Sequence, residues 1–206
     1  MPQFKTIRGT AQFEYEEKRS RFIGTAAHVE TEEEALAFLN KVRAANRTAR
    51  HNVYAYVLRE GGRTRFSDDG EPAKTAGTPV LDAITHAGYT DVIVVVTRYF
   101  GGILLGTGGL VRAYTAAASA ALAAAEPVTM RRVVQGSMRV DYAQFESVQR
   151  LLTAQGARVQ EPEYADAVTL RWRIPEEDSP ALLQALRELL RGAEQVELSA
   201  PQDAPF

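Results

Sequence analysis

Aromatic and β-branched residues recur at strand spacing through the first half of the chain, which predicts a strand-rich beginning. Two of these runs flank Gly61 and Gly62, and a glycine pair between two such runs is a strong signal for a β-hairpin. The expected strands in this part are residues 11–18, 20–29, 52–58, 63–67 and 91–100.

Three amphipathic or alanine-rich stretches predict helices between and after these strands. In the first, Thr31 and Glu34 have the spacing of a capping box, in which side chains satisfy free backbone N–H groups at the helix start. Gly88 is expected to end the second helix, and Glu126 followed by Pro127 to end the third. The expected helices are residues 31–46, 78–88 and 110–125.

The rest of the chain has a different order of expected elements, namely strand, helix, strand, strand, helix and strand. This βαββαβ order is that of the ferredoxin-like split βαβ unit. Residues 128–135 lead into it as a strand or a linker, and the proline-containing tail over 200–206 is expected to fray. The six expected elements are residues 136–142, 143–156, 157–164, 166–174, 179–192 and 193–199.

These patterns together predict an α+β protein with two domains. We expect the first domain to cover residues 1–130 and the second, ferredoxin-like, domain to cover residues 131–206, with the boundary near 127–134. A chain of 206 residues has room for two small domains and can bury most of its apolar surface without disulfides.

The composition excludes several kinds of function. The chain contains no cysteine, which excludes thiol catalysis and thiolate metal sites and fits a cytoplasmic protein. Neither a signal peptide nor an apolar run long enough to span a bilayer is recognisable, so we expect no membrane contact. The net charge is −2, and residues 1–130 hold 15 basic and 14 acidic residues against 9 and 12 in residues 131–206. Binding of a polyanion would therefore depend on a local patch.

Residues 98–114, RYFGGILLGTGGLVRAY, place glycines and two arginines between an expected strand and an expected helix. Such a position suits anion binding by backbone N–H groups. Neither standard nucleotide motif fits, because no lysine follows Lys74 and Val111 stands where a dinucleotide fingerprint has glycine or alanine. Either the glycines supply positive φ angles and close packing, or they line a groove in which Arg98 and Arg112 converge.

Residues 67–79, SDDGEPAKTAGTP, are dense in small, polar and turn-forming side chains. Their three acids are expected to pair with the arginines of the glycine stretch, and one of two threonines is expected to cap the helix that follows. In the alternative the acids would ligate a metal ion, but the spacing of an EF-hand is absent, so we expect no metal and no cofactor. The acids are Asp68, Asp69 and Glu71, and the threonines are Thr75 and Thr78.

Seven basic residues and a single acid, Glu60, lie between residues 41 and 65. Aromatic residues alternate with them, and this combination on strands suits an RNA backbone and base stacking. In the alternative, the first two basic residues complement the end of a helix and the rest point outward from a hairpin. The basic patch is Lys41, Arg43, Arg47, Arg50, Arg59, Arg63 and Arg65, and the aromatic residues are His51, Tyr54, Tyr56 and Phe66.

Catalytic patterns are weak in this sequence. The three histidines, His28, His51 and His86, fall in no metalloprotease or deaminase motif. A hydrolytic set of His51, Ser67 and Asp69 is conceivable, but a sequence cannot show its geometry. A small-molecule hydrolase built on these residues is therefore one alternative function.

With these residues identified, the chain resembles the IMPACT/YigZ family. The matching segments are KRSRFI (18–23), HNVYAY (51–56), SDDGEPAKTAGTP (67–79) and VVVTRYFGGILLGTGGLVRAY (94–114). The two long segments are specific, and the four together cover most of residues 15–115. The C-terminal βαββαβ segment is similar to the small second domain of bacterial members.

The resemblance implies a first domain with the fold of the second domain of a small-subunit ribosomal protein. It also implies a second domain similar to the last domain of elongation factor G. Both point to RNA or the translation apparatus, and for eukaryotic members the implied role is regulation of translation under stress through a protein partner. The resemblance brings no established catalytic residue with it.

We therefore expect an RNA- or ribosome-associated protein that acts in translation or its regulation. Its second, acidic domain would meet a protein partner. The alternatives are the hydrolase and a protein-interaction module without RNA contact, and fold likeness alone does not decide among them. The basic patch would extend a groove lined by Lys18, His51, Asp68, Asp69, Glu71, Lys74, Arg98, Tyr99, Gly101, Gly102, Gly106, Gly108, Gly109 and Arg112.

Overall fold

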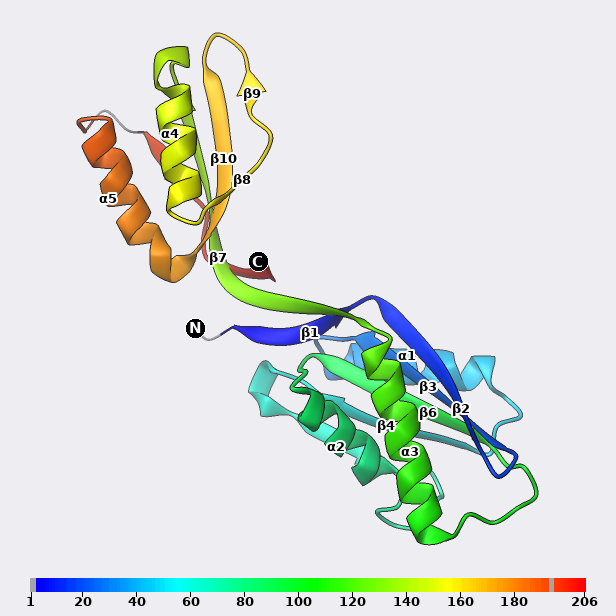
Figure 1. The fold of residues 1–206 in the computed structure, drawn as a ribbon. Coiled ribbons are helices and arrows are strands. Elements are labelled where there is room, and N and C mark those ends of the chain that lie inside the picture. The colour runs from blue at the N-terminus through cyan, green and yellow to red at the C-terminus, as the bar shows by residue number, and fades with distance from the viewer. Residues whose placement is uncertain (1–2, 193–194) are drawn as a thin grey trace. The chain divides into compact units, whose positions relative to one another are not determined.

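The computed structural model describes residues 3–192 and 195–206, and its chain forms two compact units (Figure 1). One unit consists of residues 4–129 and the other of residues 130–206 with Gln3. Each mixes helices and strands, so the predicted α+β class with two domains is confirmed. The strand β7 (Glu126–Val140) runs without a break through residues 128–135, which therefore form a strand and not a linker.

A five-stranded antiparallel sheet lies at the centre of the unit of residues 4–129. Its strand order is β2-β3-β6-β4-β5, which puts β6 in the middle. Because β3 and β4 both run antiparallel to β6, the end of β6 lies beside the beginnings of β3 and β4. The strands are β2 (Thr10–Glu17), β3 (Ser20–His28), β4 (His51–Val57), β5 (Thr64–Ser67) and β6 (Val92–Tyr99).

Helices cover both faces of this sheet (Figure 1). α2 (Gly77–Ala87) and α3 (Gly106–Ala123) pack on one face together with Val94 and Val96 of β6. α1 (Glu32–Ala45) packs on the other face with Val95. Both sets of alternating side chains on β6 are therefore buried, which explains why its sequence is an unbroken apolar run.

Local signals in the sequence account for most element boundaries in this unit. The Thr31 hydroxyl accepts from the Glu34 N–H at 3.2 Å, as the capping box predicts, and the Glu34 carboxylate accepts from the N–H of Glu30 at 2.7 Å. The predicted hairpin forms, with a short 3₁₀ turn (Glu60–Gly62) between β4 and β5. α3 begins at Gly106, four residues before its expected start.

One strand of this unit was not expected from the sequence. β1 (Phe4–Arg8) pairs with β7, and the Arg8 side chain forms a 2.8 Å ion pair with Glu126. β1 is only five residues long and includes Lys5, so its pattern of apolar and polar residues is too short to predict a strand from the sequence.

The unit of residues 130–206 contains its elements in the predicted βαββαβ order. Their sheet has the order β11-β7-β10-β8 with antiparallel neighbours, and α4 and α5 share a core with Leu170, Trp172 and Ile174. The elements after β7 are α4 (Tyr142–Ala154), β8 (Arg158–Val159), β9 (Glu163–Tyr164), β10 (Val168–Pro175), a 3₁₀ turn (Glu176–Asp178), α5 (Ser179–Leu189), β11 (Val196–Leu198) and β12 (Gln202–Pro205).

Two details of this unit differ from the expectation. The single strand expected over 157–164 is present as two short strands, β8 and β9, which both pair with β10. The tail over 200–206 was expected to fray, and this is wrong, because β12 pairs with β7 from Gln202 to Pro205. The first two residues of the strand expected over 193–199 lie outside the described residues. Among the helices that the structure describes, none is long and apolar enough to cross a membrane.

β3 and α3 approach each other closely at Gly24, where a methyl group would lie 2.4 Å from the carbonyl oxygen of Ala117. Gly24→Ala is therefore expected to lower the free energy of unfolding of this unit by about 1–3 kcal/mol, the usual range for overpacking. Urea denaturation followed by far-UV circular dichroism measures the loss.

Gly108→Ala provides the matched control, because its methyl group on the exposed first turn of α3 would meet only the end of the Arg112 side chain, at an ordinary contact distance of 3.7 Å. Its stability should stay unchanged or rise slightly, since alanine favours a helix over glycine. Equal losses in the two variants would contradict the close approach at Gly24.

Candidate functional site

The candidate site lies where the ends of three strands and two loops meet. The end of β6 carries Arg98, which pairs in register with His51 at the start of β4 on one side and with Phe22 near the start of β3 on the other. The two loops are residues 68–76, which follow β5, and residues 100–105, which connect β6 to α3. The segments that the motifs singled out therefore come together in space.

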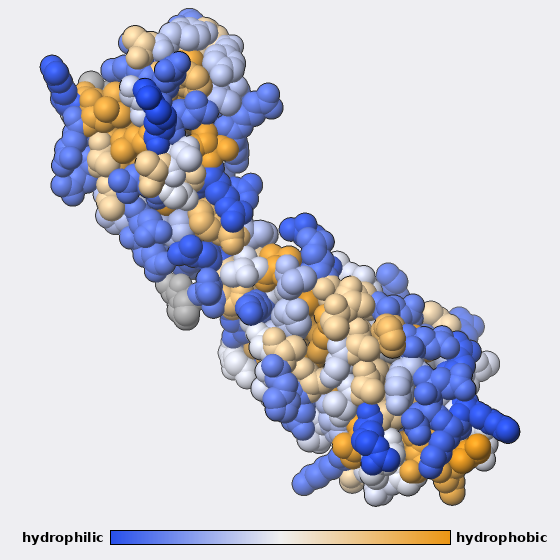
Figure 2. Space-filling model, in the orientation of Figure 1, coloured by the Kyte–Doolittle hydropathy of each residue, from blue (hydrophilic) through white to orange (hydrophobic). Residues whose placement is uncertain are grey.

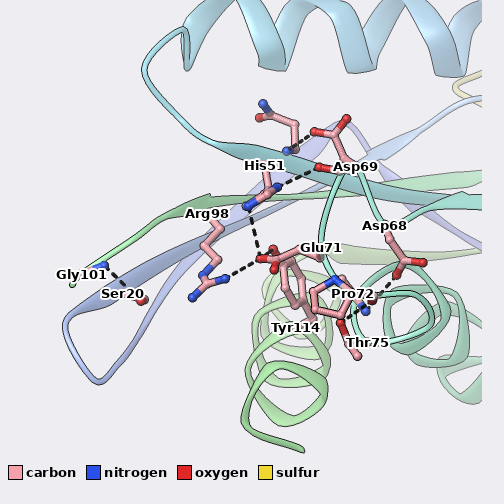
Figure 3. Close-up of polar contacts among 12 residues, drawn as sticks. Ser20, His51, Asp68, Asp69, Glu71, Pro72, Thr75, Arg98, Gly101 and Tyr114 are labelled. Carbon is pink, nitrogen blue, oxygen red and sulfur yellow. Dashed lines mark hydrogen bonds and ion pairs between the residues drawn. The ribbon is translucent and has the colours of Figure 1, made fainter. Parts of the chain in front are cut away.

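A buried ion pair between Arg98 and Glu71 occupies the centre of the site (Figure 3). The Arg98 Nη1 donates to Glu71 Oε1 at 2.6 Å, and the hydroxyl of Tyr114 on α3 donates to the same oxygen at 2.8 Å. The side chains of Arg98 and Glu71 are only 8% and 4% exposed. Burial, and then the nearby carboxylate of Glu71, raise the pKa of the Tyr114 phenol far above its ordinary value, so the hydroxyl remains a donor.

His51 is held in one orientation by the loop of residues 68–76. Its Nδ1 lies 2.8 Å from the backbone carbonyl oxygen of Asp69, and its Nε2 lies 3.9 Å from Glu71 Oε1 (Figure 3). Because a carbonyl oxygen only accepts, the contact places the proton of the neutral ring on Nδ1 and leaves the Nε2 lone pair on the side of Glu71.

This geometry does not produce the hydrolytic set considered from the sequence. The Asp69 carboxylate accepts from Arg43 at 2.9 Å and from the Asn52 N–H at 2.6 Å, so it does not orient His51. The Ser67 hydroxyl accepts from the Asp69 N–H at 3.2 Å and makes no hydrogen bond to His51 within the described chain. His51, Ser67 and Asp69 are therefore neighbours without the order that a nucleophile, base and acid require.

Asp68 anchors the same loop to the start of α2. Its Oδ1 accepts from the N–H groups of Ala76 and Gly77 at 3.1 and 2.8 Å, and its Oδ2 accepts from that of Lys74 at 2.9 Å. The expectation that Thr75 or Thr78 caps α2 is wrong, because the Thr75 hydroxyl donates to Pro72 O and no side chain of the cap residue itself caps the helix. An acid far upstream in the sequence acts as the cap instead.

The three acids of the loop therefore act separately. Asp68 binds the start of α2, Asp69 binds Arg43 of α1 and the backbone of β4, and Glu71 binds Arg98 of β6 and Tyr114 of α3. Within residues 3–192 and 195–206 no group of three or more histidines and acids is placed to hold a metal ion.

The glycines after β6 serve close packing and unusual backbone angles. A methyl group on Gly101 would lie 2.1 Å from the backbone of Arg19, and the Gly101 N–H donates to the Ser20 hydroxyl at 3.2 Å. Gly102 has a φ of +84°, an angle that side chains disfavour. Gly106, Gly108 and Gly109 all lie in the first turn of α3. Backbone geometry at Gly101 and Gly102 is thus enough to explain why glycine stands there.

Several expected members of the groove lie apart from its centre. Arg112 is exposed on α3 and is close enough to Tyr15 to influence it electrostatically. In the part of the chain that the structure describes, Arg112 makes no contact with Arg98 or Glu71. Lys18 and Lys74 are exposed in turns. Tyr99 is bound to the loop after α1, because its hydroxyl donates to the Asn46 side chain at 2.9 Å.

The basic patch divides into paired and unpaired members. Arg63 and Arg65 both face Glu32, at 3.8 and 2.7 Å, and hydrogen bonds from Tyr56 and Arg65 lower the pKa of the Glu32 carboxyl. Arg43 pairs with Asp69, and Arg59 with Asp91. The remaining members are exposed and make no ion pair or hydrogen bond among the described residues: Lys41, Arg47 and Arg50.

The aromatic residues of this run are not the stacking surface that the sequence suggested. Tyr54 and Tyr56 are 8% and 2% exposed and pack under α1, so the hypothesis that they stack on bases is wrong. The alternation of aromatic residues along β4 does not mark an exposed face, because β4 lies inside the sheet and both of its faces are covered. Phe66 on the edge strand β5 is 42% exposed, and His51 is largely buried.

An open pocket of about 270 Å³ lies directly beside the Arg98–Glu71 pair. Its outer wall includes Phe100, which is 44% exposed, and Leu104, which is 83% exposed. Figure 2 shows apolar patches among hydrophilic residues at the end of this unit where the β6–α3 loop lies in Figure 1. The pocket is lined by Arg50, His51, Gly70, Glu71, Arg98, Phe100 and Leu104.

Sequence reasoning did not identify Phe100, Leu104 or Tyr114 as members of the site. A signal was present for Leu104, because a large apolar side chain among glycines outside an expected strand or helix has no core to enter. Phe100 was expected as the last residue of a strand. No signal marked Tyr114, which lies in an alanine-rich helix and meets Glu71 only through the packing of α3 on the sheet.

Two family models match this chain. One, described as the Impact N-terminal domain, matches residues 18–122, and the other, described as a domain of unknown function (DUF1949), matches residues 138–193. A solved structure described as the crystal structure of an hypothetical protein is 34% identical with a TM-score of 0.63, and the match covers 95% of this chain and 97% of that chain.

Two curated relatives match over most of their own lengths, and a third matches over less than half. The chain is 44% identical over 177 residues to the "IMPACT family member in pol 5'region" of Thermus thermophilus, which covers 85% of this chain and 96% of that protein. It is 36% identical over 182 residues to the IMPACT family member YigZ of Escherichia coli (strain K12), which covers 87% and 89%. The Saccharomyces cerevisiae protein IMPACT homolog is 38% identical over 103 residues, or 47% of this chain and 39% of that protein.

Removal of one member of the buried ion pair should be far more harmful than removal of both. Glu71→Leu is expected to lower the free energy of unfolding by about 3–5 kcal/mol, because Arg98 then remains buried without a carboxylate. The variant Arg98→Leu/Glu71→Leu should be more stable than Glu71→Leu. Urea denaturation followed by circular dichroism measures both.

The fluorescence of Trp172, the single tryptophan, reports on the core of the other unit and provides an internal control, because its transition should not move. A double variant that is no more stable than Glu71→Leu would contradict the role of the ion pair.

Loss of the Asp68 cap should loosen the start of α2. Asp68→Ala is expected to lower the free energy of unfolding by about 1–2 kcal/mol, the upper part of the range for a helix cap. Hydrogen exchange measured by NMR should become faster at the amides of Lys74, Ala76 and Gly77. Asp82→Ala, at an exposed position of α2, should leave this exchange unchanged, and an equal effect of both variants would contradict the assignment.

Proposed function

This chain belongs to the IMPACT family, as its motifs predicted, and we propose that it is an RNA- or ribosome-associated protein that acts in translation or its regulation. The unit of residues 4–129 makes the RNA contact. The role in translation that the resemblance implies for eukaryotic members supports this proposal, since the similarity to those members falls on the same unit. In this proposal the acidic second unit binds a protein partner.

The observation that carries the proposal is a set of three exposed cations that make no ion pair or hydrogen bond among the described residues. Lys41, Arg47 and Arg50 are exposed along the end of α1 and the loop that leads to β4, and Arg50 lines the pocket itself. Their neighbours in the basic run are occupied by carboxylates. An unpaired guanidinium can form a fork of two hydrogen bonds to a phosphate without first losing an internal partner.

The backbone of an RNA is accordingly assigned to the rim of the site. Arg47 directly follows Asn46, which binds the Tyr99 hydroxyl at the end of β6, so this loop is held near the pocket. The charge of Arg98 is neutralised by Glu71 at 2.6 Å. The phosphate contacts in this proposal therefore belong to Arg47 and Arg50.

The remaining function considered from the sequence is a protein-interaction module without RNA contact. Its binding would respond to salt differently from the binding of an RNA. Contacts with phosphates release bound counterions, so the binding constant falls steeply as salt rises. Contacts between proteins through apolar surface lack this steep dependence.

Wild-type protein is expected to bind a short labelled single-stranded RNA at low salt and to lose affinity as salt rises. Arg47→Ala/Arg50→Ala should weaken binding and reduce the slope of log K against log salt by about 1.4, or 0.7 for each phosphate that the variant no longer neutralises. Fluorescence anisotropy at several salt concentrations measures the slope, and circular dichroism confirms folding.

The matched control is Arg63→Ala/Arg65→Ala, which removes the same charge from side chains that Glu32 already occupies. It should leave the slope of the wild type nearly unchanged. Absence of RNA binding at low salt, or an equal loss in both double variants, would contradict the proposal.

A further inference from the structure

The pocket beside the buried ion pair contains polar groups that the protein itself does not satisfy. Among the described residues only Nη1 of Arg98 is hydrogen-bonded, and the buried Nε has no partner, although Arg98 is only 6% exposed. Glu71 Oε1 accepts two hydrogen bonds, whereas no hydrogen bond to its Oε2 is present within the described chain. Arg98 Nε is fully buried, whereas Glu71 Oε2 is not among the fully buried atoms without a partner, so a ligand in the pocket can donate to this oxygen and gain the free energy of a hydrogen bond to a charged group.

The centre of the pocket, at the ion pair, favours a neutral ligand over a phosphate, whereas Arg50 adds a positive charge to the lining. Glu71 lines the pocket and is 4% exposed, so a phosphate beside it would bring a second negative charge close to a carboxylate that water does not screen. The positive charge of Arg98 is already neutralised by Glu71. A carboxylate oxygen and a guanidinium side by side match a group that has a donor and an acceptor on one edge.

The outer wall of the pocket provides an apolar and aromatic surface. The exposed Phe100 ring lies 5.6 Å from the Arg98 guanidinium carbon, and Leu104 is the most exposed large apolar side chain of the described residues. Aromatic rings at such positions stack on the unstacked bases of single-stranded RNA, whose edges are then read by hydrogen bonds. The volume of about 270 Å³ is slightly below the usual range for small-molecule sites, about 300–1,000 Å³, and suits one small planar group.

We propose that this pocket binds a single nucleobase of an RNA, and specifically a base with an exocyclic amino group. The amino group donates to Glu71, an adjacent ring or carbonyl acceptor accepts from Arg98, and Phe100 stacks on the base. This inference rests on the proposed RNA function and adds to it the group that enters the pocket, while Arg50 at the rim contacts the phosphate of the same nucleotide.

Cytosine and uracil provide a matched pair of probes, because they have the same size and differ at this edge. Cytosine has an amino group where uracil has a carbonyl oxygen, which would face the Glu71 carboxylate without a proton between them. Cytidine is therefore expected to bind about tenfold more tightly than uridine, as one well-placed hydrogen bond to a charged group allows.

NMR titration of the intact chain with cytidine, uridine and inorganic phosphate tests this directly. Cytidine should shift the amide signals of Gly70, Glu71 and Phe100, and uridine should do so only at much higher concentration. Phosphate, which Arg50 attracts at the rim, should leave the Phe100 signal in place. A Phe100 signal that moves with phosphate as it does with cytidine, pocket signals that move equally with cytidine and uridine, or pocket signals that cytidine does not move would overturn the proposal.

A matched pair of variants separates stacking from general apolar contact. Phe100→Leu should weaken cytidine binding about five- to a hundredfold, the range for loss of one base–aromatic stack. Phe13→Leu, at a position of β2 that is 45% exposed, compared with 44% for Phe100, should bind cytidine like the wild type. Equal behaviour of the two variants would contradict stacking on Phe100.

Failure of this inference and failure of the proposed function give different results. Salt-sensitive RNA binding by a protein that does not distinguish cytidine from uridine leaves the RNA function standing and removes the base pocket. Cytidine binding by a protein that binds no RNA at low salt leaves the pocket standing and removes the RNA function.

Discussion

The buried ion pair of Arg98 and Glu71 is the interaction on which the rest of the site depends. Two opposite charges that are almost completely withdrawn from water are tolerated only when their geometry is close and further groups stabilise them. Here the Tyr114 hydroxyl adds a second donor to the carboxylate, and the ring of Phe22 lies 5.4 Å from the guanidinium carbon. One pair thereby fixes the central strand, the acidic loop and α3 relative to one another.

The acidic loop is best understood as a connector that the three carboxylates fasten to different elements. Asp68 binds three backbone N–H groups at and before the start of α2, and Asp69 joins α1 and β4. A consequence is the fixed orientation of His51, whose ring is held by the carbonyl oxygen of Asp69. The same residues that looked like metal ligands or a catalytic set in the sequence are thus occupied in positioning the walls of the pocket.

Sequence patterns predicted the elements better than the partners of individual side chains. An unbroken apolar run identified β6, the strand spacing of aromatic and β-branched residues identified its neighbours, and the spacing of Thr31 and Glu34 located the start of α1, because these signals are local. The Arg98–Glu71 pair was among the pairings expected, but the choice of Arg98 over Arg112 depends on which face of α3 turns toward the loop. The hydrogen bonds that Asp68 accepts from backbone N–H groups six to nine positions later, and the one that Tyr114 donates to Glu71 across 43 positions, follow only from packing.

The distribution of charge gives the site a neutral interior and a basic rim. Every basic residue that packs into the structure near the pocket, Arg43 and Arg98 among them, has a carboxylate partner, whereas Arg47 and Arg50 at the surface have none among the described residues. Such a gradient suits a polymer that carries its charge on the backbone and its identity on neutral bases. Free cations attract the phosphates at the surface, and a neutralised, partly apolar pocket admits a base without the cost of burying a phosphate. Arg50, which lies on both the rim and the pocket wall, is where the two parts of such a ligand would meet.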